Sequence, residues 1–122
     1  MNAVTWVEVP VSDMSRAIKF YNSVFGWELE EVQFGDLSMA WFPWEQGGPG
    51  AAGSLVRNAN YSPSEQGALV YFHCADVDAE ASRIASAGGQ LLRGKTPISP
   101  EYGFMALALD TEGNRIALHS AQ

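Results

Sequence analysis

Few side chains in this chain could do chemistry. The two histidines, His73 and His119, could transfer protons near neutral pH, and a carboxylate beside either one could fix its tautomer and raise its pKa. The single cysteine, Cys74, cannot form an intrachain disulfide, and nothing near it in the sequence would lower its pKa. We therefore look first for acid–base or ligand-binding roles around the histidines.

Aromatic residues offer a second kind of chemistry. Trp41 and Trp44 lie on either side of Pro43, and Met39 shares a strand face with Trp41. Such side chains could stack against a planar apolar ligand, or they could belong to the core or to a dimer interface. The glycine-rich segment 46–53 that follows is not a phosphate loop, because no Lys-Ser/Thr pair and no helix follow it.

Two stretches of the chain have the same pattern. Residues 11–29 and 74–92 each leave an apolar strand, pass an acidic turn, form a short amphipathic helix and meet glycine before the next apolar run. In the first strand, Thr5–Val11, side-chain alternation places Trp6, Glu8 and Pro10 on one face.

The pattern predicts the same element order in both halves. The helices are expected at 14–25 and 77–87, the strands of the first half at 5–11, 27–34, 37–42 and 54–57, and those of the second half at 68–74, 90–93, 104–109 and 115–119, with a loop at 94–100. This predicts a single α+β domain, residues 1–122, built from two βαβββ modules at about 1–60 and 66–122.

Charge and composition narrow the range of partners. The net charge is -7 and no Lys/Arg cluster is present, which argues against nucleic acid and against an anionic membrane surface. The N-terminal segment has no basic leader and no apolar run is long enough for a membrane span, so we expect a cytoplasmic protein. The low content of charged residues, 17%, favours a homodimer.

Three segments together resemble one known superfamily. These are the FYNSVFGWEL helix end, the ADVDA…ASAGG helix and the DTEGNRIALHS ending. They are similar to the vicinal oxygen chelate superfamily, the group of glyoxalase I, bleomycin-resistance proteins and extradiol dioxygenases, over essentially the whole chain. The resemblance implies paired βαβββ modules, usually in a dimer, whose strands curl around a cavity. It also implies a divalent metal ion held there by His, Gln or Glu side chains.

The positions that the resemblance assigns to metal ligands hold unsuitable residues. The first ligand position falls on Trp6, the one that opens the second module on Leu69, and the last on Ala117. The closing strand of the first module, 51–57, contains no carboxylate, histidine or glutamine. These side chains have no lone pair suited to a divalent cation. We therefore expect no metal at the usual site and no other cofactor.

Residues two positions along a strand share a face, so the resemblance also indicates what replaces the metal. Two steps from the ligand positions lie Glu8, Tyr71 and His119, and one further step along the second module's first strand lies His73. Glu8 and His119 could act as an acid–base pair, or could hold a shifted metal ion together with His73. Alternatively, Glu8 is a partly buried carboxylate that accepts a hydrogen bond from His119 or Tyr71 without a catalytic role, and both histidines lie near strand ends at the solvent.

Three functions follow from these alternatives. The first is a metal-free protein that binds a small apolar or aromatic molecule through Trp6, Tyr71, His73, Met39 and Trp41. The second is an enzyme of the lyase, isomerase or dioxygenase type that uses Glu8 and His119. The third is a structural dimer without a ligand.

Overall fold

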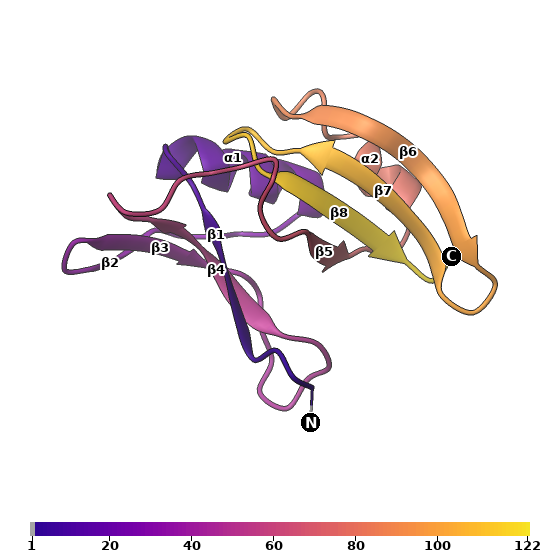
Figure 1. Cartoon of the computed structure of the whole chain (residues 1–122), viewed down its shortest axis with the longest axis horizontal. Helices are drawn as coiled ribbons and strands as arrows, with labels where there is room; N and C mark the ends of the chain where they lie inside the picture. Colours follow the sequence, from indigo (N-terminus) through magenta and orange to yellow (C-terminus); the bar gives the residue numbers. More distant parts are fainter. Residues whose placement is uncertain (1) are drawn as a thin grey trace.

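The computed structural model describes residues 2–122, so only Met1 of the expected domain lies outside the described residues. The chain forms two four-stranded sheets, one from each half, and each half carries one helix (Figure 1). The first half contains β1 (Trp6–Pro10), α1 (Met14–Phe25), β2 (Val32–Phe34), β3 (Leu37–Trp41) and β4 (Ala52–Arg57). The second half contains β5 (Val70–His73), α2 (Val77–Ala81), β6 (Gln90–Ser99), β7 (Gly103–Leu109) and β8 (Arg115–Ser120).

The two halves have the same topology. The strand orders are β1-β4-β3-β2 and β5-β8-β7-β6, and in each half the first strand pairs in parallel with the last. The match extends to individual hydrogen bonds. The Val11 N–H donates to the Val56 carbonyl at 2.9 Å, and the Cys74 N–H donates to the His119 carbonyl in the same way at 2.7 Å. The predicted α+β fold of two βαβββ modules is confirmed. Its strands form two separate sheets rather than one continuous curled sheet.

Both helices begin where their sequences predict. Asp13 caps α1 by accepting from the Arg16 N–H, and Asp76 caps α2 by accepting from the Asp78 N–H. The predicted end of α2 at residue 87 is wrong, because the α-helix stops at Ala81. Beyond it the chain continues in separate turns, where the Ser82 and Ser86 hydroxyls bond backbone carbonyls three residues earlier. Serine offers the backbone such alternatives to a regular helix.

Two strand predictions are also wrong in extent. The segment 27–34 is a strand only at Val32–Phe34, because Trp27 stacks on Phe25 at a centroid distance of 4.6 Å and the Leu29 N–H is taken up by the Asn22 side chain. The expected loop at 94–100 instead continues β6 to Ser99 with register shifts. Because β6 is the edge strand of its sheet, it tolerates Pro97 and these irregularities.

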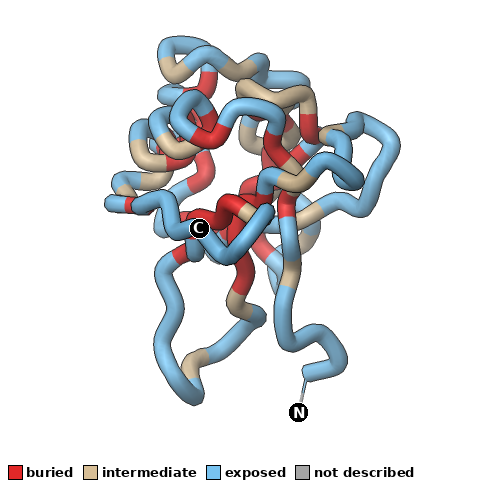
Figure 2. The backbone as a smooth tube through the Cα atoms, turned by 90° about the vertical axis from the view of Figure 1, so that its left-hand side faces the viewer, coloured by how far each residue is buried: buried red, intermediate tan, exposed pale blue. Residues whose placement is uncertain are grey.

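The helices and the inner faces of both sheets bury one shared core. Figure 2 shows the buried residues gathered in the middle of the molecule and the outer loops exposed. The core contains a packed aromatic group formed by side chains from both halves: Tyr21, Phe25, Trp27, Phe42 and Phe72. Within residues 2–122, both helices pack into this core, and neither covers the opposite face of its sheet. No helix within residues 2–122 is long and apolar enough to cross a bilayer.

Candidate functional site

The face of the first sheet that points away from the helices carries most of the predicted site residues. Along β1, Trp6 and Glu8 are exposed while Val9 and Val11 are buried, as the alternation predicts. Glu8 lies opposite Ser54 of β4. On its other side, Ser54 lies opposite Trp41 of β3. The strand register therefore places Glu8, Ser54 and Trp41 in one row across the sheet.

Three aromatic rings on this face are in contact. Trp6 meets Trp41 edge-on, with ring centroids 6.1 Å apart, and Phe34 stacks on Trp41 at 6.2 Å. Their exposed fractions are 41%, 44% and 48% for Trp6, Trp41 and Phe34, which is high for side chains of this size. Met39, which the sequence analysis grouped with them, is only 9% exposed. We call Trp6, Trp41 and Phe34 the aromatic patch.

One buried polar atom lies within the same sheet face. The Ser54 hydroxyl has no hydrogen-bond partner among the described residues, and the residue is fully buried. A buried hydroxyl without a partner is energetically costly, so a bound polar group or a water molecule next to it would be stabilised. Ser54 is therefore a polar group covered by its neighbours on this sheet face, and it does not reach the surface.

Glu8 borders two hollows in the surface. One, of about 180 Å³, lies between the two modules and is lined by apolar residues of β1, β5 and β8, with Arg115 also on its wall. The other, of about 360 Å³, lies between Glu8, Val56 and Tyr61. Both are open, and both include Pro10 and Ser62. Glu8 is thus the charged group that the two hollows share.

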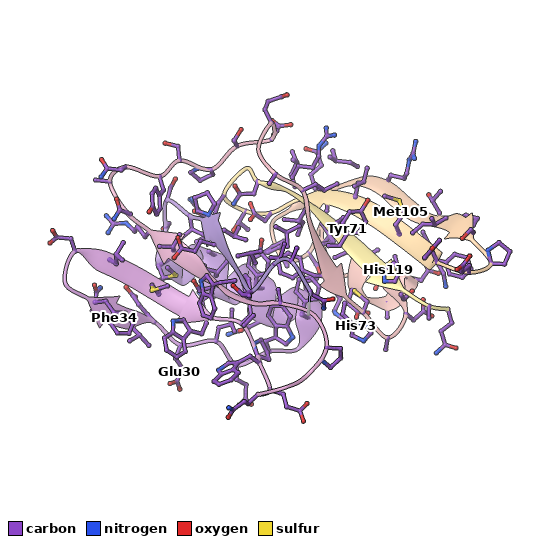
Figure 3. The ribbon with its side chains drawn as sticks, turned by 60° about the horizontal axis from the view of Figure 1, so that its bottom comes forward. Glu30, Phe34, Tyr71, His73, Met105 and His119 are labelled. Carbon is purple, nitrogen blue, oxygen red and sulfur yellow. The ribbon has the colours of Figure 1, made fainter. Side chains whose placement is uncertain are left out.

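The second sheet carries the histidines on its own open face. His73 of β5 and His119 of β8 are register partners, and Met105 of β7 is the next partner of His119. The Nε2 atom of His119 lies 2.7 Å from the Tyr102 carbonyl oxygen, to which it donates its hydrogen. Figure 3 shows His73, Met105 and His119 together with Tyr71 on this sheet, away from Phe34.

Glu8 and His119 are not bonded to each other in the described residues, because no hydrogen bond or ion pair joins them there. Glu8 and Arg115 line the same hollow, and His119 lies four residues beyond Arg115 along β8, about 13 Å from Arg115 at ~3.3 Å per residue. Residues 2–122 contain no group of three or more His, Cys, Asp or Glu side chains arranged to hold a metal ion.

The sequence as a whole places this geometry in a known family. A profile of the Glyoxalase/Bleomycin resistance protein/Dioxygenase superfamily matches residues 3–118. The chain belongs to this superfamily. Among curated proteins, a glyoxylase-like domain-containing protein of Didymella fabae is 27% identical over 125 residues, which cover 94% of this chain and 91% of that protein.

Solved structures of the superfamily share the fold. A glyoxalase I variant from Zea mays superposes with a TM-score of 0.74 at 23% identity over 96% of this chain. The chain spans less than half of that maize protein, 46%. A glyoxylase/bleomycin resistance protein/dioxygenase domain from Frankia sp. matches end to end, with a TM-score of 0.73, 14% identity, and coverage of 100% and 99%.

Within this superfamily fold, the repeat reveals a position that the sequence analysis missed. Tyr71 pairs with Ala117 as Glu8 pairs with Ser54, so Ser54 is the first-module equivalent of Ala117. Ser54 and Met105 lie on strands from which the sequence analysis chose no site residue, so they are found only through the pairing of β4 with β3 and of β7 with β8. The contact between Phe34 and Trp41 depends on the register of the β2–β3 hairpin, which the sequence does not specify by itself.

Proposed function

We propose that this superfamily member binds a small apolar or aromatic molecule without a metal ion, on the open face of its first sheet. The observation that carries this proposal is the aromatic patch, because two indoles and a phenyl ring are exposed in mutual contact. Exposed aromatic groups of this kind are typical of binding surfaces. Glu8, which borders the hollows beside the patch, supplies a polar contact that orients a ligand.

The proposal excludes a metal ion at the family's usual site, because the side chains at that site are not metal ligands. The positions that the resemblance assigns to ligands hold Trp6, Leu69 and Ala117, and the repeat adds Ser54. A single hydroxyl with an indole, an isobutyl and a methyl group does not fit a divalent cation. Acid–base catalysis by Glu8 and His119 is the less favoured function, because no hydrogen bond or ion pair joins the two side chains in residues 2–122.

A homodimer forms part of the same proposal. Besides the aromatic patch, the open faces expose Val32 on the first sheet and Leu69 and Tyr71 on the second, with exposed fractions of 42%, 39% and 52%. A second copy that covers part of these faces would bury some of this exposed apolar surface and narrow the hollows beside Glu8, while the patch and the histidines stay accessible. Sedimentation velocity of the purified protein at micromolar concentration is expected to show a dimer. A monomer at all concentrations would contradict this part of the proposal.

Ligand binding is tested with neutral bicyclic aromatics, 2-naphthol first, by isothermal titration calorimetry in EDTA. Binding is expected to persist in EDTA, and Trp6→Ala and Trp41→Ala are each expected to weaken it roughly tenfold, the size of one aromatic contact of ~1.4 kcal/mol. Trp44→Ala is the matched control, because Trp44 is a more exposed indole, 60%, outside the patch. Equal affinity in Trp6→Ala and in the control would overturn the proposal.

A further inference from the structure

We propose that His73, His119 and Met105 form a binding site for monovalent copper on the open face of the second sheet. The three residues lie in one row across adjacent strands, with His119 of β8 between His73 of β5 and Met105 of β7. Register partners in neighbouring strands point to the same side of the sheet. The inference is independent of ligand binding at the aromatic patch, which is on the other sheet.

The spacing of His73, His119 and Met105 across the three strands suits one ion that lies above His119. Neighbouring strands are ~4.8 Å apart, so the backbones of His73 and Met105 are separated by about 10 Å, and both have long side chains that can lean inward. The middle residue must use a donor atom close to its backbone, because it lies directly below the ion. His119 has such an atom in Nδ1.

The hydrogen bond of His119 leaves that nitrogen free. Its Nε2–H donates to the Tyr102 carbonyl at 2.7 Å, so the neutral ring carries its lone pair on Nδ1. Histidine ligands of metal ions almost always donate their other ring N–H to a carbonyl or carboxylate in this way. Tyr102, in the turn between β6 and β7, therefore orients the ring for coordination.

The donor set selects the ion. The set has two imidazoles, which suit copper among other transition metals, and a soft thioether, which favours Cu(I) over the harder divalent ions; it contains no carboxylate. His73 is exposed, and His119 and Met105 are partly so, which leaves the site open to an entering ion. The equivalent row of the first sheet, Pro10, Val56 and Met39, has a methionine in the matching place but no imidazole.

Cys74 does not belong to this site, although it follows His73 directly. Its side chain lies on the opposite face of the strand, 2% exposed, and its Sγ is 3.8 Å from the Phe72 carbonyl oxygen. Burial, followed by the nearby Glu80 charge, raises the pKa of this thiol to about 12. A thiolate is therefore not available there at neutral pH.

The test is an anaerobic competition for Cu(I) between the intact protein and bicinchoninate, with ascorbate as the reductant. We expect one Cu(I) per chain. His73→Gln and His119→Gln are each expected to weaken binding by more than about tenfold, since even changes to outer-shell partners of a metal site cost 10–100-fold. His73 is exposed, so its variant keeps the fold, which far-UV circular dichroism checks. Unchanged affinity in His73→Gln, or no copper bound at all, would overturn the proposal.

X-ray absorption identifies the donors. The extended fine structure at the copper K-edge is expected to show nitrogen scatterers and one sulfur scatterer. Met105→Leu is expected to remove the sulfur. Met39→Leu is the matched control, because Met39 occupies the equivalent place in the first sheet, and Cys74→Ala tests the thiol. Loss of the sulfur scatterer in Cys74→Ala rather than in Met105→Leu would assign the copper to the cysteine and contradict the site.

Discussion

The Tyr21 hydroxyl donates a hydrogen bond to the Asp110 carboxylate at 2.7 Å, and this buried contact joins the helix of the first module to the last turn of the second. Burial, with the charge of Asp110 as the next cause, raises the pKa of Tyr21 well above its usual value. Asp110 also accepts from the backbone N–H groups of Glu112 and Asn114. The contact thus ties α1 of the first module to the 110–114 turn of the second, and the relative placement of the two sheets depends on this link.

Removing this hydroxyl is expected to destabilise the protein. Tyr21→Phe deletes a hydrogen bond to a buried carboxylate and should lower the free energy of unfolding by about 1–3 kcal/mol in urea denaturation. Tyr102→Phe is the control, because Tyr102 is 62% exposed and its side chain should contribute little. Equal midpoints for the two variants would show that the contact adds nothing to stability.

Glu112 should make stability depend on acid pH. Burial acts to raise its pKa, but the Arg16 guanidinium and the N–H groups of Asp13 and Ser12 outweigh that effect, so the pKa is lowered from 4.5. A carboxylate whose pKa is lowered by folding stabilises the folded protein at pH values above its pKa in the unfolded state. That stability is lost as the pH falls through its pKa in the folded state.

The corresponding measurement compares urea midpoints from pH 6 down to pH 3. The wild-type protein is expected to lose stability below about pH 4.5 more steeply than Glu112→Gln, which cannot titrate there. Glu65→Gln serves as the control because Glu65 is an exposed surface residue. If Glu112→Gln and the wild type followed parallel curves, Glu112 would not contribute to the acid transition.

Cys74 should be inert in the folded protein. With a pKa of about 12, only about one thiol in ten thousand is ionised at pH 8, and the side chain is buried besides. Ellman's reagent is therefore expected to react with it within minutes in 6 M guanidinium but over hours in buffer. Rapid labelling of the native protein would mean that the segment at the end of β5, where Cys74 lies, opens readily.

Gly103 should not tolerate a side chain. Its φ is 79°, and an added Cβ would overlap the Ser120 carbonyl oxygen, whereas no atom of the described chain lies within 4 Å of a Cβ added at Gly94. Gly103→Ala is therefore expected to lower the free energy of unfolding by more than about 1 kcal/mol, and Gly94→Ala is the matched control. Similar thermal midpoints for both variants would contradict this turn geometry.

Local pattern predicted the repeat and its faces well, because both depend on short-range rules. The acidic caps Asp13 and Asp76 and the alternation of Trp6 and Glu8 with buried valines follow from neighbouring residues alone. The early end of α2 was missed because serine hydroxyls, which are compatible with a helix in the sequence, bond local carbonyls instead.

The relations between elements could not be predicted in the same way. Whether Glu8 approaches His119 depends on how the two sheets are placed, which the contacts of Tyr21 and Glu112 determine across about 90–100 residues of sequence. The row of His73, His119 and Met105 depends on the register of three strands. Such long-range pairings have no local signal.

The central claim, metal-free binding of an aromatic molecule at Trp6 and Trp41, is tested most directly by the four tryptophan indole N–H signals in a ¹⁵N-correlated NMR spectrum. Trp27, in the core group, and Trp44, outside the patch, are internal controls. On titration with 2-naphthol in EDTA, we predict saturable shifts of the Trp6 and Trp41 signals while those of Trp27 and Trp44 stay in place. No saturable shift at Trp6 and Trp41, or shifts confined to Trp44, would contradict the account.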